Sequence, residues 1–212
     1  MKYRGIIFDL DGVICFTDQY HYQAWKNLAD EIGVYFDEQI NNRLRGVSRM
    51  DSLDIILEKS EKEYTKVEKA VLAEKKNTLY VSLLENMTSA DLPHEVKETL
   101  DKLRQAGMLL AIGSSSKNAK LILSHLGLEG YFDAISDGTN ITNSKPDPEV
   151  FLKAAQFINF KPEECLVVED AIAGIDAAIA GGFASAGLGE AATHTNVTYP
   201  MSKFSDLLTV TE

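Results

Sequence analysis

The chain has 212 residues, a length that suits one domain with a substantial core or a core domain with a smaller companion. Hydrophobic residues make up 45% and charged residues 25%, ordinary globular values that exclude a mainly disordered or collagen-like protein. The 21 basic residues are outnumbered by 32 acidic ones, and with a net charge of −11 we expect no nucleic-acid partner. An anionic substrate would require basic side chains concentrated at one site.

No segment has the pattern of a targeting or membrane-spanning sequence. The N-terminal apolar run, residues 5–8, ends at Asp9 and is too short for the core of a signal peptide. No other stretch approaches the length needed to cross a bilayer. The two cysteines, Cys15 and Cys165, are far apart and form no zinc-type motif. We expect a cytoplasmic protein with no membrane partner.

The first predicted element is a strand over residues 5–8. The segment that follows it has no strand-like run, but it carries helical spacing at Ala24, Leu28 and Ile32. This change of pattern predicts a small helical subdomain inserted after the first strand. We expect a helical cap domain within a core domain, with boundaries 16–87 for the cap and 1–15 plus 88–212 for the core.

The rest of the chain alternates between apolar runs and helical patterns. Further strand-like runs lie at residues 108–112, 165–168 and 183–186. Continuous apolar runs bounded by turn residues are typical of strands buried on both faces. Helical patterns separate them, for example over residues 96–103 and from Asp147 onward. Alternating strands and helices predict an α/β fold with a doubly wound, Rossmann-like parallel sheet.

Reactive side chains stand at the carboxyl ends of these runs. Acidic pairs follow two of the strands, a serine cluster follows another and a lysine precedes a helix: Asp9 and Asp11, Glu169 and Asp170, Ser114 to Ser116, and Lys145. Taken singly, each has an ordinary explanation as a turn, capping or surface residue. Because the carboxyl ends of parallel strands meet at one edge of a sheet, their joint placement predicts a site. Carboxylates, a hard cation and a lysine are the groups that phosphoryl transfer requires.

The sequence at these positions resembles the haloacid dehalogenase-like phosphotransferases. Residues 8–13, FDLDGV, match the first motif of that family, and the later motifs are matched in order by Ser114, Lys145-Pro146 and Glu169-Asp170. The helical insertion is similar to the first type of cap in this family. The resemblance implies that Asp9 is the nucleophile and becomes an aspartyl phosphate, and that Asp11 is the general acid and base.

The resemblance also implies the groups that hold the phosphoryl oxygens and a metal ion. Ser114 and Lys145 would bind the oxygens of the transferring group. A Mg²⁺ ion would be held by Asp9, by the backbone carbonyl of Asp11 and by Asp170, with Glu169 nearby. These roles suit the chemistry, because a carboxylate can attack an anionic phosphoryl group only when cations neutralise both.

A narrower resemblance is to the beta-phosphoglucomutase branch of the family. It is carried by His21 to Trp25, Gly46 to Arg49, Asp51 to Leu53, Lys76-Asn77 and Ser116 to Asn118. It implies that Arg49 grips the phosphate that is not being transferred and that the core loop faces it. The predicted substrate-binding residues are those that the resemblance implies and their neighbours in the same motifs: His21, Trp25, Gly46, Val47, Arg49, Ser52, Lys76, Ser115, Ser116, Lys117 and Asn118. Taken singly, His21 could be an ordinary helix histidine, Trp25 is more often a packing residue, and Arg49 could be a solvated surface arginine.

Two segments depart from the family pattern, and one peptide bond is expected to be unusual. Residues 15–18, CFTD, replace an acid that the family often carries there, and Ser115 stands where a small apolar residue is common. Both departures could alter the motion of the cap or its phosphate contacts. We expect the Lys145–Pro146 bond to be cis, because the loop must turn sharply to aim Lys145 inward before a helix begins.

The function that these resemblances imply is a mutase acting on sugar phosphates. Its substrates would be beta-glucose 1-phosphate and glucose 6-phosphate, with beta-glucose 1,6-bisphosphate as the intermediate, and we expect a monomer. A sugar-phosphate phosphatase is the alternative, because the four core motifs do not distinguish the two activities. A non-catalytic sugar-phosphate binding protein is a weaker alternative, since every expected catalytic residue is present.

Overall fold

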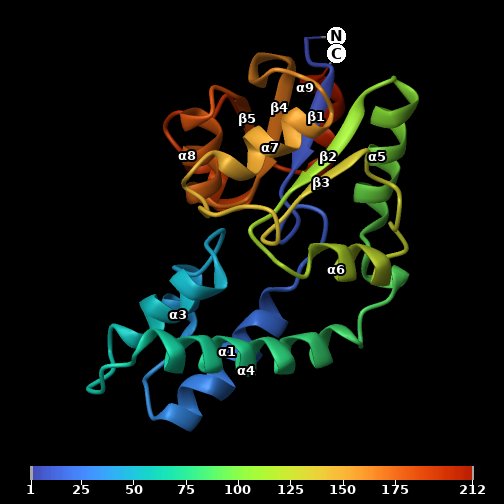
Figure 1. Cartoon of the computed structure of the whole chain (residues 1–212). Coiled ribbons are helices and arrows are strands. Elements are labelled where there is room, and N and C mark those ends of the chain that lie inside the picture. The colour runs from blue at the N-terminus through green and yellow to red at the C-terminus, as the bar shows by residue number, and fades with distance from the viewer. Residues whose placement is uncertain (1, 212) are drawn as a thin grey trace.

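The computed structural model describes residues 2–211 and contains a six-stranded sheet flanked by helices (Figure 1). The strand order is β3-β2-β1-β4-β5-β6, and each neighbouring pair is parallel. The strands are β1 (Gly5–Phe8), β2 (Leu109–Gly113), β3 (Ala134–Ser136), β4 (Cys165–Glu169), β5 (Ala184–Gly187) and β6 (Tyr199–Pro200). The predicted α/β fold with a doubly wound parallel sheet is therefore confirmed.

The four predicted strands correspond to β1, β2, β4 and β5, whereas β3 and β6 were not predicted. Every residue of β1 and β4 is buried, which explains why their apolar runs are continuous. The sequence of β3, Ala-Ile-Ser, has no such run because the strand is short and partly exposed. The strand β6 is an edge strand of only two residues. Sheet edges bury too little surface to leave an apolar signature.

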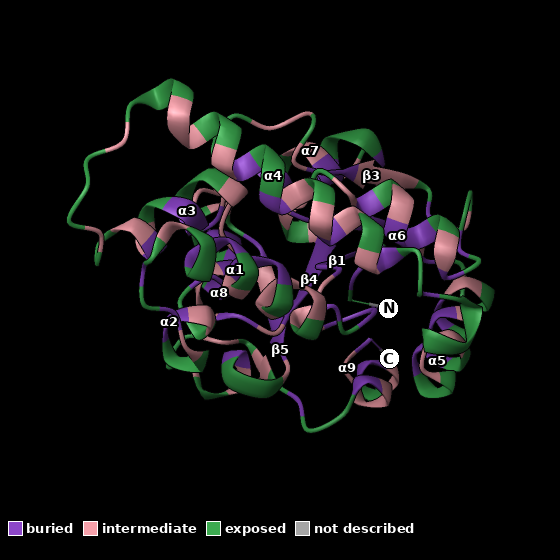
Figure 2. Cartoon of the chain, turned by 90° about the horizontal axis from the view of Figure 1, so that it is seen from below, coloured by how far each residue is buried: buried purple, intermediate pink, exposed green. Residues whose placement is uncertain are grey.

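Helices cover both faces of the sheet. On one face, Ile6 and Phe8 belong to a cluster that includes residues of α5 (His94–Gln105), α6 (Ala119–His125) and α9 (Leu207–Val210). On the other face, Ile7 packs with α7 (Glu149–Phe157) and α8 (Ile172–Ala180). Adjacent residues of one strand thus serve opposite cores. Figure 2 shows buried strands inside and exposed helix surfaces outside.

Short 3₁₀ helices complete the connections of the core. They are η1 (Ser89–Asp91), η2 (Pro162–Glu164), η3 (Gly189–Thr193) and η4 (Phe204–Asp206). Among the helices of residues 2–211, none combines the length and apolar character that crossing a membrane requires.

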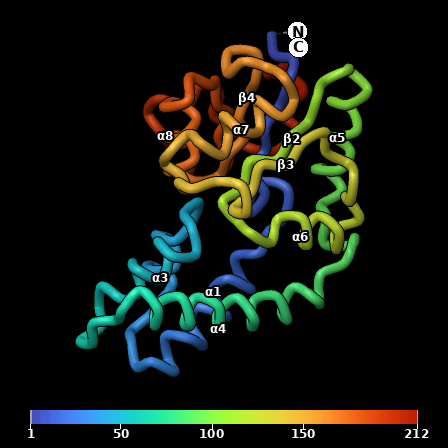
Figure 3. The backbone as a smooth tube through the Cα atoms, in the orientation of Figure 1, coloured from blue at the N-terminus to red at the C-terminus, as the bar shows by residue number. Residues whose placement is uncertain are grey.

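Residues 16–87, which we call the insert, contain four helices and no strand. The helices are α1 (Asp18–Ile32), α2 (Glu38–Asn42), α3 (Arg49–Leu57) and α4 (Lys66–Leu84). They share a separate apolar cluster that includes Trp25, Phe36 and Ile56. Figure 3 shows the chain leaving the core after β1 and returning through α4 to α5. The insert therefore has its own core and lies beyond the carboxyl edge of the sheet.

Candidate active site

The register of the central strands brings the predicted site to one edge of the sheet. Phe8 pairs with Ile112 of β2 and with Val168 of β4, so these three strands end at nearly the same level. Asp9 follows β1 directly, while Ser114 and Asp170 follow β2 and β4. This edge faces the insert (Figure 1).

Lys145 is the buried cation of the site. Its Nζ donates to Asp9 Oδ1 and, at 2.5 Å, to Glu169 Oε1. Burial alone would lower the pKa of Lys145, but the charges of Asp9 and Glu169 outweigh it and raise that pKa. The lysine therefore remains charged beside the proposed nucleophile. The Lys145–Pro146 peptide bond is cis, as predicted.

Three carboxylates form a group that suits a metal ion. Asp9, Glu169 and Asp170 each offer an oxygen within 4.8 Å of the others. Burial, followed by the charge of Glu169, raises the pKa of Asp170 to about 7, and burial likewise raises the pKa of Asp9 well above its usual range. The one buried lysine cannot compensate three acids, of which Asp9 and Glu169 are buried and Asp170 is partly buried, so a divalent cation fits the unmet charge.

The individual acids have different surroundings. Glu169 Oε2 accepts the backbone N–H groups of Asp170 and Ala171 at 2.9 and 3.0 Å, while its Oε1 accepts from Lys145. Both oxygens thus already accept hydrogen bonds. Within residues 2–211 the Asp170 carboxylate has a single side-chain donor, the Arg45 guanidinium of the insert at 3.4 Å. Asp9 and Asp170 are consequently the acids best placed to hold a cation. A Cβ on Gly12 would lie 2.1 Å from Asp170 Oδ2, so only glycine fits there.

Asp11 lies outside this acid group and faces the insert. Its Oδ1 accepts a hydrogen bond from the Thr17 hydroxyl, which in turn accepts one from the Tyr80 hydroxyl at 3.2 Å. Burial raises the pKa of Asp11 to about 6, and the Thr17 hydrogen bond opposes that rise. A carboxyl group with this pKa can give up and take back a proton near neutral pH, as a general acid and base must.

A buried lysine and histidine of the insert lie on the same side of the site. Lys76 Nζ is 3.0 Å from His21 Nδ1 and lies over the rings of Trp25 and Tyr80. Burial, followed by the charge of Arg49, lowers the pKa of Lys76 to about 7. Burial and the charge of Lys76 also lower the pKa of His21, so the neutral imidazole can accept a hydrogen bond from the ammonium group.

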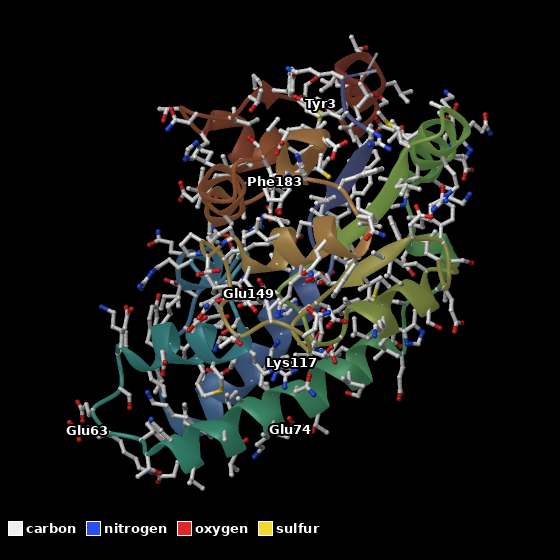
Figure 4. All side chains as sticks on the ribbon, turned by 45° about the horizontal axis from the view of Figure 1, so that its top comes forward. Tyr3, Glu63, Glu74, Lys117, Glu149 and Phe183 are labelled. Carbon is white, nitrogen blue, oxygen red and sulfur yellow. The ribbon has the colours of Figure 1, made fainter. Side chains whose placement is uncertain are left out.

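A second cationic region lies away from Asp9, where the core loop meets the insert. Arg49 is the first residue of α3, and its Nη1 is 3.4 Å from the exposed Glu74 carboxylate. Figure 4 shows Lys117 between the core and α4, the helix that carries Glu74. Nearby, Asn118 Nδ2 donates to Asn77 Oδ1 at 3.0 Å. This region offers positive charge to a second anionic group.

One cavity of about 1280 Å³ joins these regions, and its lining includes every predicted site residue except Glu169. Glu169 lies beneath it, fully buried. The lining also includes Asp18, Arg45, Asp51 and Ser144, which the sequence analysis did not assign to the site, although Asp18 and Asp51 lie in segments that it discussed. Thr17 and Tyr80 were likewise missed as partners of Asp11. Their contacts join residues distant in sequence, so no local motif marks them.

Comparisons with known proteins agree with this geometry. The family model for haloacid dehalogenase-like hydrolases matches residues 3–182. The chain is 38% identical over 206 residues to the beta-phosphoglucomutase of Bacillus subtilis, covering 96% of this chain and 91% of that protein. It is 31% identical over 182 residues to the phosphorylated carbohydrates phosphatase of Thermotoga maritima, covering 84% and 82%.

A solved structure extends this likeness to the arrangement of core and insert. The crystal structure of beta-phosphoglucomutase from Clostridium difficile superposes with a TM-score of 0.92 at 40% identity, over 97% of this chain and 93% of that one. With motifs, geometry and relatives in agreement, the chain belongs to the haloacid dehalogenase-like hydrolase family.

Proposed function

We propose that the chain is a beta-phosphoglucomutase that interconverts beta-glucose 1-phosphate and glucose 6-phosphate. The observation that carries the proposal is the presence of two cationic regions in one cavity, at Lys145 and at Arg49 with Lys117. A bisphosphate intermediate needs both, because only one of its phosphates can lie at Asp9. The similarity to beta-phosphoglucomutases of Bacillus subtilis and Clostridium difficile supports the same activity.

The first half-reaction uses Asp9 as the nucleophile. Its carboxylate oxygen attacks phosphorus of the bisphosphate, the bond from phosphorus to the sugar oxygen breaks, and that oxygen takes the proton of Asp11. Lys145, held by Glu169, and the Ser114 hydroxyl bind the phosphoryl oxygens. Glucose 6-phosphate then leaves and beta-glucose 1-phosphate binds. In the second half-reaction Asp11 removes the proton of its 6-hydroxyl, that oxygen attacks the phosphorus on Asp9, and the bond from phosphorus to the Asp9 carboxylate breaks. The bisphosphate so formed must turn over before its other phosphate can reach Asp9.

Asp9, Asp170 and the backbone carbonyl of Asp11 are the proposed ligands of a Mg²⁺ ion, with Glu169 beside them. When bound, this ion supplies positive charge that offsets the negative charge of the phosphoryl group. The insert, residues 16–87, acts as the cap of a core formed by residues 1–15 and 88–212. A single chain supplies both sides of the cavity, which agrees with a monomeric enzyme.

The second candidate is a sugar-phosphate phosphatase, in which water accepts the phosphoryl group from Asp9. The 31% identity to the Thermotoga maritima phosphatase favours it, since the core chemistry up to the aspartyl phosphate is the same. A non-catalytic binding protein is not favoured, because Asp9, Asp11, Ser114 and Lys145 all lie in the cavity.

The deciding experiment supplies beta-glucose 1-phosphate, Mg²⁺ and a catalytic amount of beta-glucose 1,6-bisphosphate, and follows glucose 6-phosphate and free phosphate together. A mutase forms glucose 6-phosphate with little free phosphate, whereas a phosphatase forms free phosphate in proportion to substrate consumed. Asp9→Asn is the matched control for contaminating activity.

A further inference from the structure

Two serines of the core hold the segment of the insert that carries Arg49. The Ser115 hydroxyl donates to the Gly46 carbonyl at 2.9 Å, and the Ser144 hydroxyl donates to Asp51 Oδ2 at 2.6 Å. Gly46 precedes Arg49 by three residues and Asp51 follows it by two. The core therefore holds this segment on both sides of the arginine.

The two hydrogen bonds differ in burial, because the Ser115–Gly46 bond is partly buried and the Ser144–Asp51 bond is exposed. Gly46 has a φ of +75°, and a Cβ placed on it would lie 3.5 Å from Ala171 Cβ, so its backbone runs close to the core. Asp51 Oδ2 also accepts the Ser48 hydroxyl at 2.6 Å, while Ser48 caps the N-terminus of α3 by accepting from the Asp51 N–H. The Ser144 bond thus connects the core directly to the start of the helix that carries Arg49.

The two serines are also neighbours of the phosphoryl site. Ser115 follows Ser114 and Ser144 precedes Lys145, so each lies next to a residue that we assign to the transferring phosphoryl group. Other contacts between core and insert use groups assigned to ligands, such as Asp170 with Arg45 and Asn118 with Asn77. The serine bonds use neither the proposed metal ligands nor the Arg49 guanidinium. Ser115 and Gly46 are themselves predicted substrate-binding residues, whereas Ser144 and Asp51 are not, so the Ser144 bond is the one that can persist unchanged when substrate binds.

We propose that Ser115 and Ser144 are positioning residues that latch the insert over phosphorylated Asp9 and thereby favour the sugar over water as acceptor. This inference rests on the proposed mutase function. In transfer, the bond from phosphorus to Asp9 breaks, a bond from phosphorus to the sugar oxygen forms and the hydroxyl proton passes to Asp11. In hydrolysis a water oxygen takes the place of the sugar oxygen, which releases inorganic phosphate and the free Asp9 carboxylate.

Transfer to the sugar and hydrolysis use the same groups of the protein. The ratio of their rates therefore depends on which acceptor, sugar or water, reaches the phosphorus, and water gains access when the insert opens. Loss of a serine hydroxyl leaves Gly46 O or one lone pair of Asp51 without its donor in the closed state only. The open state loses nothing, because water satisfies these acceptors there, so the equilibrium moves toward opening.

The test uses Ser115→Ala and Ser144→Ala, singly and combined, with Ser124→Ala as the matched control. Ser124 is exposed on α6, and its side chain does not line the cavity. The first readout is free phosphate formed per glucose 6-phosphate from beta-glucose 1-phosphate with Mg²⁺ and catalytic bisphosphate. The second is deuterium exchange of the amides of residues 46–51, with Mg²⁺ and glucose 6-phosphate present.

We expect each latch variant to raise the ratio of free phosphate to glucose 6-phosphate about fivefold, the effect of one net hydrogen bond. Exchange in residues 46–51 should rise by a similar factor, and the double variant should exceed either single one. Ser144→Thr keeps a hydroxyl and should restore both readouts, whereas Ser124→Ala should change neither. Unchanged ratios and exchange in both single variants and the double variant would overturn the latch.

The same design separates this inference from the proposed function. If the wild-type protein forms only free phosphate, the proposed mutase function is wrong. Deuterium exchange of residues 46–51, compared between wild type and the serine variants, still shows whether the serines hold the insert. A mutase whose exchange and product ratio are insensitive to both serines contradicts the latch and leaves the proposed function intact.

Discussion

The Thr17 hydroxyl donates a hydrogen bond to the Asp11 carboxylate, and it is itself held by the Tyr80 hydroxyl at 3.2 Å. Thr17 precedes α1 and Tyr80 lies in α4, so two helices of the insert determine the environment of the proposed acid and base. Burial raises the pKa of Asp11 to about 6, while the hydrogen bond from Thr17 lowers it. The insert thus sets the proton affinity of Asp11 as well as covering it.

Thr17→Val should shift the acid side of the pH–rate profile upward. The hydrogen bond stabilises the charged carboxylate, so its loss raises the pKa of Asp11 above the present value of about 6. Activity that needs the carboxylate as a base is lost as pH falls through this pKa, and in the variant that loss begins at a higher pH. The pH dependence of kcat/KM for beta-glucose 1-phosphate measures the shift. Thr78→Val, exposed on α4, is the control, and identical profiles for wild type and Thr17→Val would refute the assignment.

Asp9→Asn should abolish turnover while the protein remains folded. Loss of a covalent nucleophile should exceed the roughly 10²–10⁴-fold contribution of acid and base catalysis, so we expect less than about one-thousandth of wild-type activity. Thermal unfolding checks that the fold survives. Turnover clearly above that level in a folded variant would mean that another group attacks phosphorus.

The central part of this site could be predicted because its residues follow buried strands. Asp9, Ser114 and Asp170 come after apolar runs whose burial is visible in the sequence, and parallel strands bring their ends together. Lys145 is different, because it follows no apolar run; its position before a helix and the family resemblance indicated its place, while its burial was not evident from its own segment. The location of each predicted residue in or beneath the cavity agrees with the expected roles, while the roles themselves remain predictions.

The contacts between the core and the insert could not be predicted from local sequence. Arg45 contacts both Asp18 and Asp170, yet these three residues come from three separate segments. Ser144 looks like an ordinary loop serine until the fold places Asp51 beside it. Such pairs depend on the position of the insert relative to the sheet, and neither hydrophobic periodicity nor capping motifs encode that position. The short edge strands β3 and β6 were missed for a related reason, since pairing rather than composition defines them.

Addition of Mg²⁺ should stabilise the protein more at about pH 8 than at about pH 6. The folded protein keeps the Asp170 proton up to a pKa of about 7, whereas an aspartate with its ordinary pKa of 3.8 has lost it. Folding therefore binds a proton between these values, and the metal-free protein loses stability as the pH rises through this interval. A divalent cation offsets the charge of the ionised acids, so its effect is greatest above the folded pKa.

Thermal unfolding with and without Mg²⁺ measures this effect. At an ion concentration of about one hundred times its Kd, the midpoint at the higher pH should rise by about 5–10 °C. Asp170→Asn should reduce the rise and its pH dependence. An equal rise at both pH values, or the same rise in the variant, would contradict the assignment of Asp170 as a ligand.

Arg49→Ala should weaken binding of the second phosphate while leaving the chemistry at Asp9 nearly unchanged. The guanidinium can form two parallel hydrogen bonds to a phosphate, and its present partner, Glu74, is exposed and 3.4 Å away, which leaves it available. Loss of two charge-assisted hydrogen bonds should reduce kcat/KM for beta-glucose 1-phosphate about 10²–10³-fold. Arg49→Lys should recover only about a tenth of the wild-type value, because an ammonium group keeps the charge but lacks the planar fork. Thermal stabilisation by Mg²⁺ and phosphorylation of Asp9 by acetyl phosphate should change much less, since neither needs a second phosphate.

The control for this change is Arg43→Ala, which removes another arginine of the insert. Arg43 makes a bidentate ion pair with Glu58 at 2.8 Å and does not line the cavity, so its loss should leave turnover near the wild-type level. A comparable fall in both variants would indicate a general effect of charge on the insert. If Arg49→Ala retains full isomerase activity, the cationic region at Arg49 does not hold the second phosphate. The mutase proposal depends on two separate phosphate sites, so that result would contradict it. A phosphatase would then be the function that the cavity supports better.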